Sequence, residues 1–337
     1  KANFTATIVS SSVGIAMAWQ GFSYWALATQ PNLYIAINTL LYWHYSHWRP
    51  SWRIDWTPVR RMFRFSSKIL ASAVLTDINN NIMNILLGHY YSARDTGSYN
   101  QAFQWHSKAY YLIQGTLQQV AQPVLVDVGD ERERQLRILR KMMRLAAFLS
   151  FPLLFGLGMV SHEFIVFTIT EKWATSASFM RLLCISGAFV PLSFLLSNLI
   201  ISKGRSSVYL GINAGLGAAQ IAAMLFLYPY GIRPMIMALV IINILCFWVW
   251  GLFARHYAGY QLMMIARDTL PFALIALCVM GVTWFTTRFI DSLSLLLLAR
   301  VSMASLLYFV IMKVAGVVVL KEIIAFVREK TRRKQKT

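Results

Sequence analysis

KILASAVLTDINNNIMNILLGHYYSARDTGSYNQAFQWHSKAYYLIQGTLQQVAQ, residues 68–122, is the stretch that decides the fold of this chain. It predicts two membrane-spanning helices joined by a short turn, because each half is long enough to cross a ~30 Å hydrocarbon core. Both halves carry more polar side chains than a plain anchor does. A charge at mid-membrane costs roughly 2.5–3.5 kcal/mol, so these side chains must face a partner or water.

The polar residues of this pair recur at helical spacing, which places them on one face of each helix. The first helix carries the set Asp77, Asn80, Asn81 and Asn84, at positions i, i+3, i+4 and i+7. The second carries a similar stripe: Gln101, Gln104, Lys108, Tyr111, Gln118 and Gln122. Two facing polar stripes at mid-membrane depth predict the wall of a hydrated cavity, and hence a transporter.

The composition indicates a polytopic membrane protein. Hydrophobic residues make up 57% of the 337 residues, above the ~45–50% of a soluble domain, and the mean hydropathy is +0.53. This length allows about ten transmembrane helices, so the predicted fold class is all-α. The net charge of +19 is also a property of nucleic-acid binders. Here the basic residues lie in loops between spans, so we expect membrane lipids as partners and no nucleic acid.

The basic loops predict the orientation. If the loop at 49–64 is cytoplasmic, alternation of ten spans places every strongly basic segment on that side, as the positive-inside rule requires. These segments are 132–144, 203–205, 255–267 and the C-terminal tail. The chain begins at Lys1 without a Met or a signal peptide, and an apolar run follows almost at once, which is consistent with a piece of a longer protein.

Six short stretches together resemble a known family. In order they are GFSYWAL (21–27), WRP (48–50), DTGSYNQA (95–102), QPVL (122–125), EKW (171–173) and KGRS (203–206). Their order and spacing resemble the lipopolysaccharide and exopolysaccharide flippases, of O-antigen and colanic-acid type, in the multidrug/oligosaccharidyl-lipid/polysaccharide exporter superfamily. The likeness runs down to about Tyr209, and beyond it only hydropathy and helix count agree.

The resemblance implies two six-helix lobes and two extra helices, with about four helices of the first lobe absent from this chain. The implied parts are the last two helices of the first lobe (1–48), a basic cytoplasmic linker (49–62), the complete second lobe (63–256), two accessory helices (257–320) and a basic cytoplasmic tail (321–337). It implies a transporter, not an enzyme, in the bacterial inner (cytoplasmic) membrane.

The implied cargo is a polyprenyl-pyrophosphate-linked oligosaccharide, moved to the outer leaflet by alternating access for surface polysaccharide biosynthesis. Polysaccharide polymerase and export machinery are further implied partners, and no cofactor or metal is expected. Such a cargo needs cations for its pyrophosphate, and amides and stacking faces for its sugars. We assign Lys68, His106 and Lys108 to the first role. To the second role we assign Asn80, Asn84, Gln104, Tyr111 and Gln118.

Structural roles are the alternative for these residues. The amides would then join neighbouring helices, at ~0.6 kcal/mol per bond, and Lys68 would snorkel to the interface. Asp77 is expected to pair with Lys108, or else to serve as a proton or sodium site. Arg181 and Arg300, which also lie inside apolar runs, are predicted to snorkel.

Two other functions compete with polysaccharide export. A multidrug exporter of the same superfamily would need an acid-rich apolar pocket, whereas these helices offer one acid among several bases and amides. A polytopic glycosyltransferase or polymerase would need catalytic acids or a metal site and a large outer loop. The acids of the short outer loops are scattered singly, which favours export.

Overall fold

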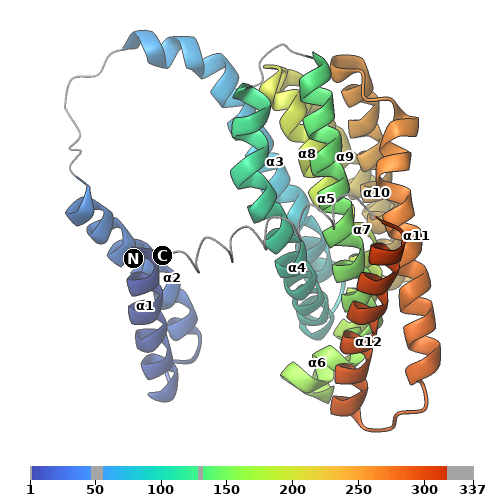
Figure 1. The fold of residues 1–337 in the computed structure, drawn as a ribbon. Coiled ribbons are helices and arrows are strands. Elements are labelled where there is room, and N and C mark those ends of the chain that lie inside the picture. The colour runs from blue at the N-terminus through green and yellow to red at the C-terminus, as the bar shows by residue number, and fades with distance from the viewer. Residues whose placement is uncertain (1, 47–55, 128–131, 317–337) are drawn as a thin grey trace, which may run out of the picture. The chain divides into compact units, whose positions relative to one another are not determined.

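The computed structural model describes residues 2–46, 56–127 and 132–316 (Figure 1). Within these ranges the regular structure is helical and contains no strand, which confirms the all-α class. The chain divides into two compact units, Lys1–Arg61 and Met62–Thr337, which are considered separately. Residues 49–55 of the predicted linker and the predicted tail at 321–337 lie outside the described residues, and residues 56–62 of the linker form the start of α3.

The first unit contains a helical hairpin of α1 (Ala2–Trp19) and α2 (Ser23–Tyr45). Gly21 turns the chain between them with φ +86°, a conformation that favours glycine because it has no Cβ. The Gln30 amide donates to the Ser11 hydroxyl at 3.2 Å across the hairpin. The Tyr42 hydroxyl on α2 also donates to Asn3 Oδ1 on α1 at 2.9 Å. Hydrogen bonds between the helices thus supplement the packing of the hairpin.

The second unit is a helical bundle. Its members are α3 (Trp56–Tyr90, which starts in the first unit), α4 (Ala93–Asp127), α5 (Arg132–Met159), α6 (Ser161–Ile169), α7 (Ala174–Gly187), α8 (Val190–Ser202), α9 (Ser206–Leu227), α10 (Ile232–Ala258), α11 (Leu262–Thr287) and α12 (Leu293–Val314). In the described ranges, six segments are long and apolar enough to cross a membrane: α5, the α7–α8 pair with the preceding 3-10 turn, and α9 to α12. The other four predicted spans correspond to the helices α1 to α4, which are not among these six.

The start of α4 follows from its sequence. Ser92 Oγ accepts a hydrogen bond from the Asp95 backbone N–H at 3.1 Å and donates to the Asp95 carboxylate at 2.7 Å. This reciprocal arrangement satisfies a free N–H of the first helical turn. The cap ends the turn after α3 and starts α4 at Ala93, so the two 35-residue helices follow each other closely.

The span predicted over residues 179–201 is two helices. Pro191 has no N–H to donate to the carbonyl four residues earlier, at Gly187, so the helix ends there and restarts as α8. The carbonyl of Ala188, inside the break, accepts a hydrogen bond of 2.7 Å from the Ser150 hydroxyl on α5. A side chain from a neighbouring helix therefore satisfies the interrupted backbone, as a membrane interior requires.

Three contacts at successive levels hold α3 beside α9. They join Lys68 to Ser207, Asn79 to Asn213, and Tyr90 to Tyr228. Because the residue numbers rise together along both helices, α3 and α9 run parallel. All three contacts are polar or aromatic, and Gly217 on α9 leaves the space that the Asn79 side chain occupies.

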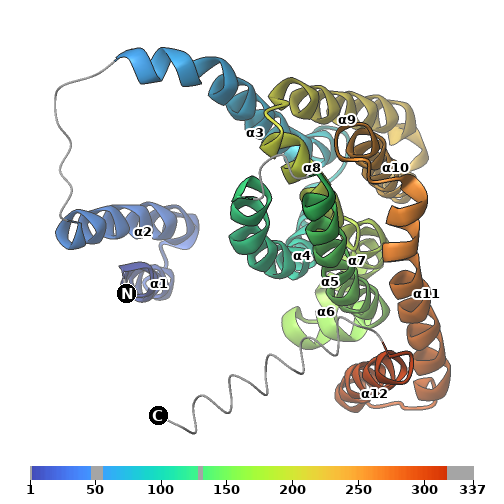
Figure 2. The same cartoon turned by 45° about the horizontal axis from the view of Figure 1, so that its top comes forward.

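The helices α11 and α12 lie along one side of the bundle (Figure 2). Asp268 on α11 accepts hydrogen bonds from Arg140 at 2.8 Å and Arg144 at 2.6 Å, both on α5, and from the Tyr260 hydroxyl at 2.9 Å. Burial, reinforced by the Asp268 carboxylate, raises the pKa of Tyr260 above its usual range, which keeps that hydroxyl a donor. This cluster fixes the beginning of α11 to α5.

A second charged contact attaches α12. Arg300 is 6% exposed and its guanidinium donates to the Glu163 carboxylate on α6 at 2.7 Å and to the Thr287 hydroxyl at 3.2 Å. The prediction that Arg300 snorkels is therefore wrong. The hydropathy pattern predicted one continuous span over α5 and α6, and α6 supplies the acid Glu163 that pairs with Arg300. A paired charge can stay buried where a lone charge cannot.

Candidate functional site

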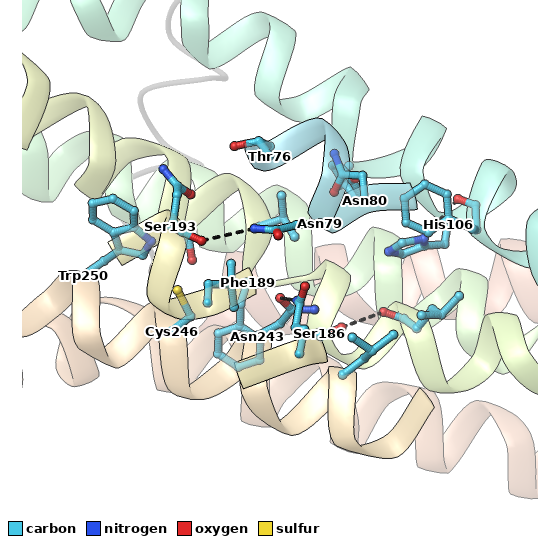
Figure 3. A pocket seen from close by; sticks show the side chains of 18 of the residues that line it. Thr76, Asn79, Asn80, His106, Ser186, Phe189, Ser193, Asn243, Cys246 and Trp250 are labelled. Carbon is cyan, nitrogen blue, oxygen red and sulfur yellow. Dashed lines mark hydrogen bonds between the residues drawn. The ribbon is translucent and has the colours of Figure 1, made fainter. Parts of the chain in front are cut away.

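An interior pocket of about 200 Å³ lies among α3, α4 and α7 to α10 (Figure 3). Its polar lining consists mainly of amides, hydroxyls and one imidazole. The amides and imidazole are Asn79, Asn80, His106, Asn213, Gln220 and Asn243. The lining contains no acid and no Lys or Arg among the described residues, so the pocket offers hydrogen bonds and no formal charge.

The amides of the pocket connect α3, α9 and α10. Asn79 donates to the Asn213 carbonyl at 3.2 Å, and Gln220 Nε2 donates to Asn243 Oδ1 at 3.2 Å. The buried Gln220 Oε1 has no hydrogen-bond partner among the described residues. Gln220 Oε1 is therefore an acceptor that these interhelical hydrogen bonds do not use.

His106 belongs to this interior. It is 5% exposed, and its Nδ1 lies 3.1 Å from the Phe103 carbonyl oxygen. Its ring packs against Gly187 so closely that a Cβ there would lie 2.8 Å from His106 Cδ2. Lys108, two residues later, is exposed. Two helical positions differ by about 200° in direction, so the structure does not bring these two predicted cations together.

Other residues of the polar stripe predicted on α4 lie on the side of the helix that faces away from the bundle. The exposed members are Gln104, Lys108, Tyr111 and Gln118. Lys108 Nζ lies 4.7 Å from the centroid of the Trp105 ring, which packs edge-on against Phe164 at 5.0 Å. Lys108 is about 22 Å along the helix from Ala93, so a ~30 Å hydrocarbon core that begins near Ala93 would include it. We call Gln104, Lys108, Tyr111 and Gln118 the outward face of α4.

The predicted residues of α3 divide between two environments. Asp77 is exposed, whereas Asn80 and Asn84 are half-buried and Asn80 lines the interior pocket. Lys68 is half-buried and donates to the Ser207 hydroxyl. In the described part of the chain no ion pair joins Asp77 to Lys108, so the expected pair does not form and Lys108 instead lies over Trp105.

Four amides of the pocket were not predicted: Asn79, Asn213, Gln220 and Asn243. A signal existed for the last three, because each is an isolated amide within an otherwise apolar run. Asn79 was passed over because it lies off the stripe of Asp77 and Asn80. Among the residues with described positions, no cluster of three or more His, Cys, Asp or Glu could hold a metal ion.

Comparison with known proteins identifies the family. Residues 1–178, more than half of the chain, match the family model described as polysaccharide biosynthesis protein. The chain belongs to this family. The matched segment includes α3, the outward face of α4 and α5, and it stops before α8 to α10, which complete the interior pocket.

Curated relatives of the family come from several bacteria. The chain is 24% identical over 213 residues to the lipopolysaccharide biosynthesis protein WzxC of Escherichia coli K12, covering 61% of this chain and 41% of that protein. It is 29% identical over 171 residues to the teichuronic acid biosynthesis protein TuaB of Bacillus subtilis, covering 50% and 35%. The chain thus spans well under half the length of these relatives.

A solved structure has the same fold. The lipid II flippase MurJ, in an inward closed conformation, matches with a TM-score of 0.67 and 15% identity, over 92% of this chain and 66% of that chain. Family membership and this fold establish a multi-pass membrane protein of the polysaccharide biosynthesis family.

Proposed function

We propose that this protein moves a polyprenyl-pyrophosphate-linked oligosaccharide across the bacterial inner membrane by alternating access. Relatives that support this include the succinoglycan biosynthesis transport protein ExoT of Rhizobium meliloti, 22% identical over 192 residues, beside the flippase fold. The protein acts as a transporter and not as an enzyme, because moving a lipid between leaflets requires a wet path for its head and no covalent step. Polymerase and export machinery are its proposed neighbours.

The outward face of α4 is the single observation that carries the proposal. Its amides and Lys108 point away from the packed interior, where Tyr99, Ala102 and Ile113 of the same helix are buried. A lysine held out from a bundle at membrane depth is costly unless it meets water or an anion. Trp105 under Lys108 adds a contact of roughly 0.5–1 kcal/mol at an exposed site, too little to offset lipid exposure.

The nine predicted site residues take two roles in this proposal. Gln104, Lys108, Tyr111 and Gln118, with Asp77 on the neighbouring helix, contact the cargo head group. Lys108 binds pyrophosphate, and the amides bind sugar hydroxyls. Lys68, Asn80, Asn84 and His106 hold α3 and α4 to the bundle, because each is at least half-buried. Lys68 also donates to Ser207 on α9, and the His106 ring packs against Gly187 on α7.

Charge reversal at Lys108 tests the proposal. In a strain that lacks the chromosomal gene, Lys108→Glu should abolish surface polysaccharide and leave lipid-linked repeat units on the inner leaflet, while its membrane abundance stays normal. The matched control is Lys313→Glu, which reverses an exposed lysine on α12 and should leave export unchanged. Normal surface polysaccharide from the Lys108→Glu variant would reject the assignment of Lys108 to the cargo site. Intact surface polysaccharide together with altered drug sensitivity in the deletion strain would reject the proposed transport of a lipid-linked oligosaccharide.

A further inference from the structure

An apolar groove of about 520 Å³ runs along the outside of α9 and α10, away from the outward face of α4. Small residues on α9 form its floor: Gly211, Gly215 and Ala219. A Cβ added at either glycine would have no neighbour within 4 Å, so the space beside them is open. Aliphatic side chains of α10, including Leu245 and Val249, form the opposite wall and are 58% and 38% exposed.

The groove has the length of one membrane leaflet. From Val208 to Ala219 it follows α9 for eleven residues, or about 16 Å. Half of a ~30 Å hydrocarbon core is about 15 Å. A single acyl chain that enters at one membrane surface and ends near the midplane matches this span. Both helices are long and apolar enough to cross the bilayer.

The surface end of the groove is basic. Arg205 immediately precedes α9, three residues before the groove residue Val208. Its guanidinium lies 5.5 Å from the centroid of the Tyr257 ring, one helical turn beyond the groove residue Phe253 on α10. His256 continues the groove-lining side of α10 and is exposed. The described helices α9 and α10 contain no acidic residue. The charge at this mouth is therefore complementary to a lipid phosphate.

We propose that the α9–α10 groove binds one anionic phospholipid, with its phosphate at Arg205 and His256 and one acyl chain along Gly211 and Gly215. The glycines supply depth, since larger side chains there would fill the hollow. Arg205 supplies head-group preference, because each basic residue at a membrane surface contributes about fivefold in affinity for acidic lipids. Helices α9 and α10 separate the groove from the interior polar pocket, and Leu216 and Cys246 line both. The bound lipid therefore covers the outer side of these two helices.

Titration of the full chain in detergent with dioleoylphosphatidylglycerol or dioleoylphosphatidylethanolamine, followed by native mass spectrometry, tests this site. The first phosphatidylglycerol should bind at least about fivefold tighter than phosphatidylethanolamine. Arg205→Gln should remove that preference. The control Arg255→Gln, at the same end of α10 but on the opposite face, should preserve it. Equal affinity of the native chain for both lipids would overturn the proposal.

Filling the groove tests the acyl-chain contact. Gly215→Leu, and independently Gly211→Leu, should weaken the first binding step for both lipids at least tenfold. The control is Gly281→Leu on α11, another exposed helical glycine with open space around it, and it should leave both affinities unchanged. Unaltered affinity in either groove variant that folds would overturn the proposal. So would a native dimer that Gly215→Leu dissociates, because a second copy would then occupy the groove.

Discussion

Removing the arginine from the buried pair between α12 and α6 should destabilise the protein strongly. In the Arg300→Met variant the Glu163 carboxylate stays among apolar neighbours without its partner, since the two side chains are only 7% and 9% exposed. At 2.7 Å the attraction is roughly 6 kcal/mol at an effective dielectric of 20. Several kcal/mol of desolvation per ion offsets that attraction in the native protein. The single variant retains the acid's desolvation cost without the attraction, so we expect a loss of about 3–5 kcal/mol.

The double variant separates this account from simple loss of contacts. Glu163→Gln with Arg300→Met removes both charges and keeps most of the volume, so its free energy of unfolding should return to within about 1–2 kcal/mol of the native value.

Unfolding in mixed micelles of dodecyl maltoside and dodecyl sulfate, followed by tryptophan fluorescence, measures these differences. The control is Arg181→Met, an exposed arginine in another apolar run, which should change stability by no more than about 0.5 kcal/mol. Additive losses in the double variant, or a loss at Arg300 equal to that at Arg181, would refute the reasoning.

Four substitutions with smaller expected effects test the packing of the second unit in the same unfolding assay. Gly217→Ala puts a Cβ 2.2 Å from Asn79 Oδ1. The overpacking should cost about 1–3 kcal/mol and outweigh the ~1 kcal/mol by which alanine favours a helix over glycine. Adding Asn79→Ala should remove the overpacking cost. Gly215→Ala on the same helix meets open space and should stabilise by up to about 1 kcal/mol; a loss there would contradict the contrast. Gly259→Ala, at φ +72° after α10, should cost about 1–2 kcal/mol. Tyr260→Phe removes one of three donors to the buried carboxylate on α11 and should cost about 1.5–3 kcal/mol, and a neutral result would mean that the two arginines suffice.

The interior amides show where sequence reasoning reached its limit. Period and hydropathy predicted that Asn80 lies on the polar side of its helix, and Asn80 does line the pocket. Asn213, Gln220 and Asn243 line the same pocket from helices more than 130 residues further along the chain. Asn213 and Gln220 are seven residues apart and so share one face of α9, but this spacing does not say which helices that face meets. Their common location follows only from the packing of α9 and α10 beside α3.

His106 and Lys108 illustrate a different limit. Their helical spacing already places them on different faces of α4. Which face enters the bundle depends on the surfaces that α5, α7 and α8 present, and on Gly187, which leaves room for the imidazole. The sequence analysis assigned both residues to the pyrophosphate of the cargo, whereas the packing buries the imidazole of His106 and leaves the ammonium of Lys108 exposed.

By itself the sequence determined that this is an all-α, multi-pass membrane protein, and its short stretches in order pointed to the correct family. These properties are local, because hydrophobic length and backbone hydrogen bonding in a bilayer dictate helices without reference to neighbours. Only the tertiary structure decided which polar side chains meet. Arg300 finds its acid 137 residues away, and the free energy of a charge depends on what surrounds it in space and not along the chain.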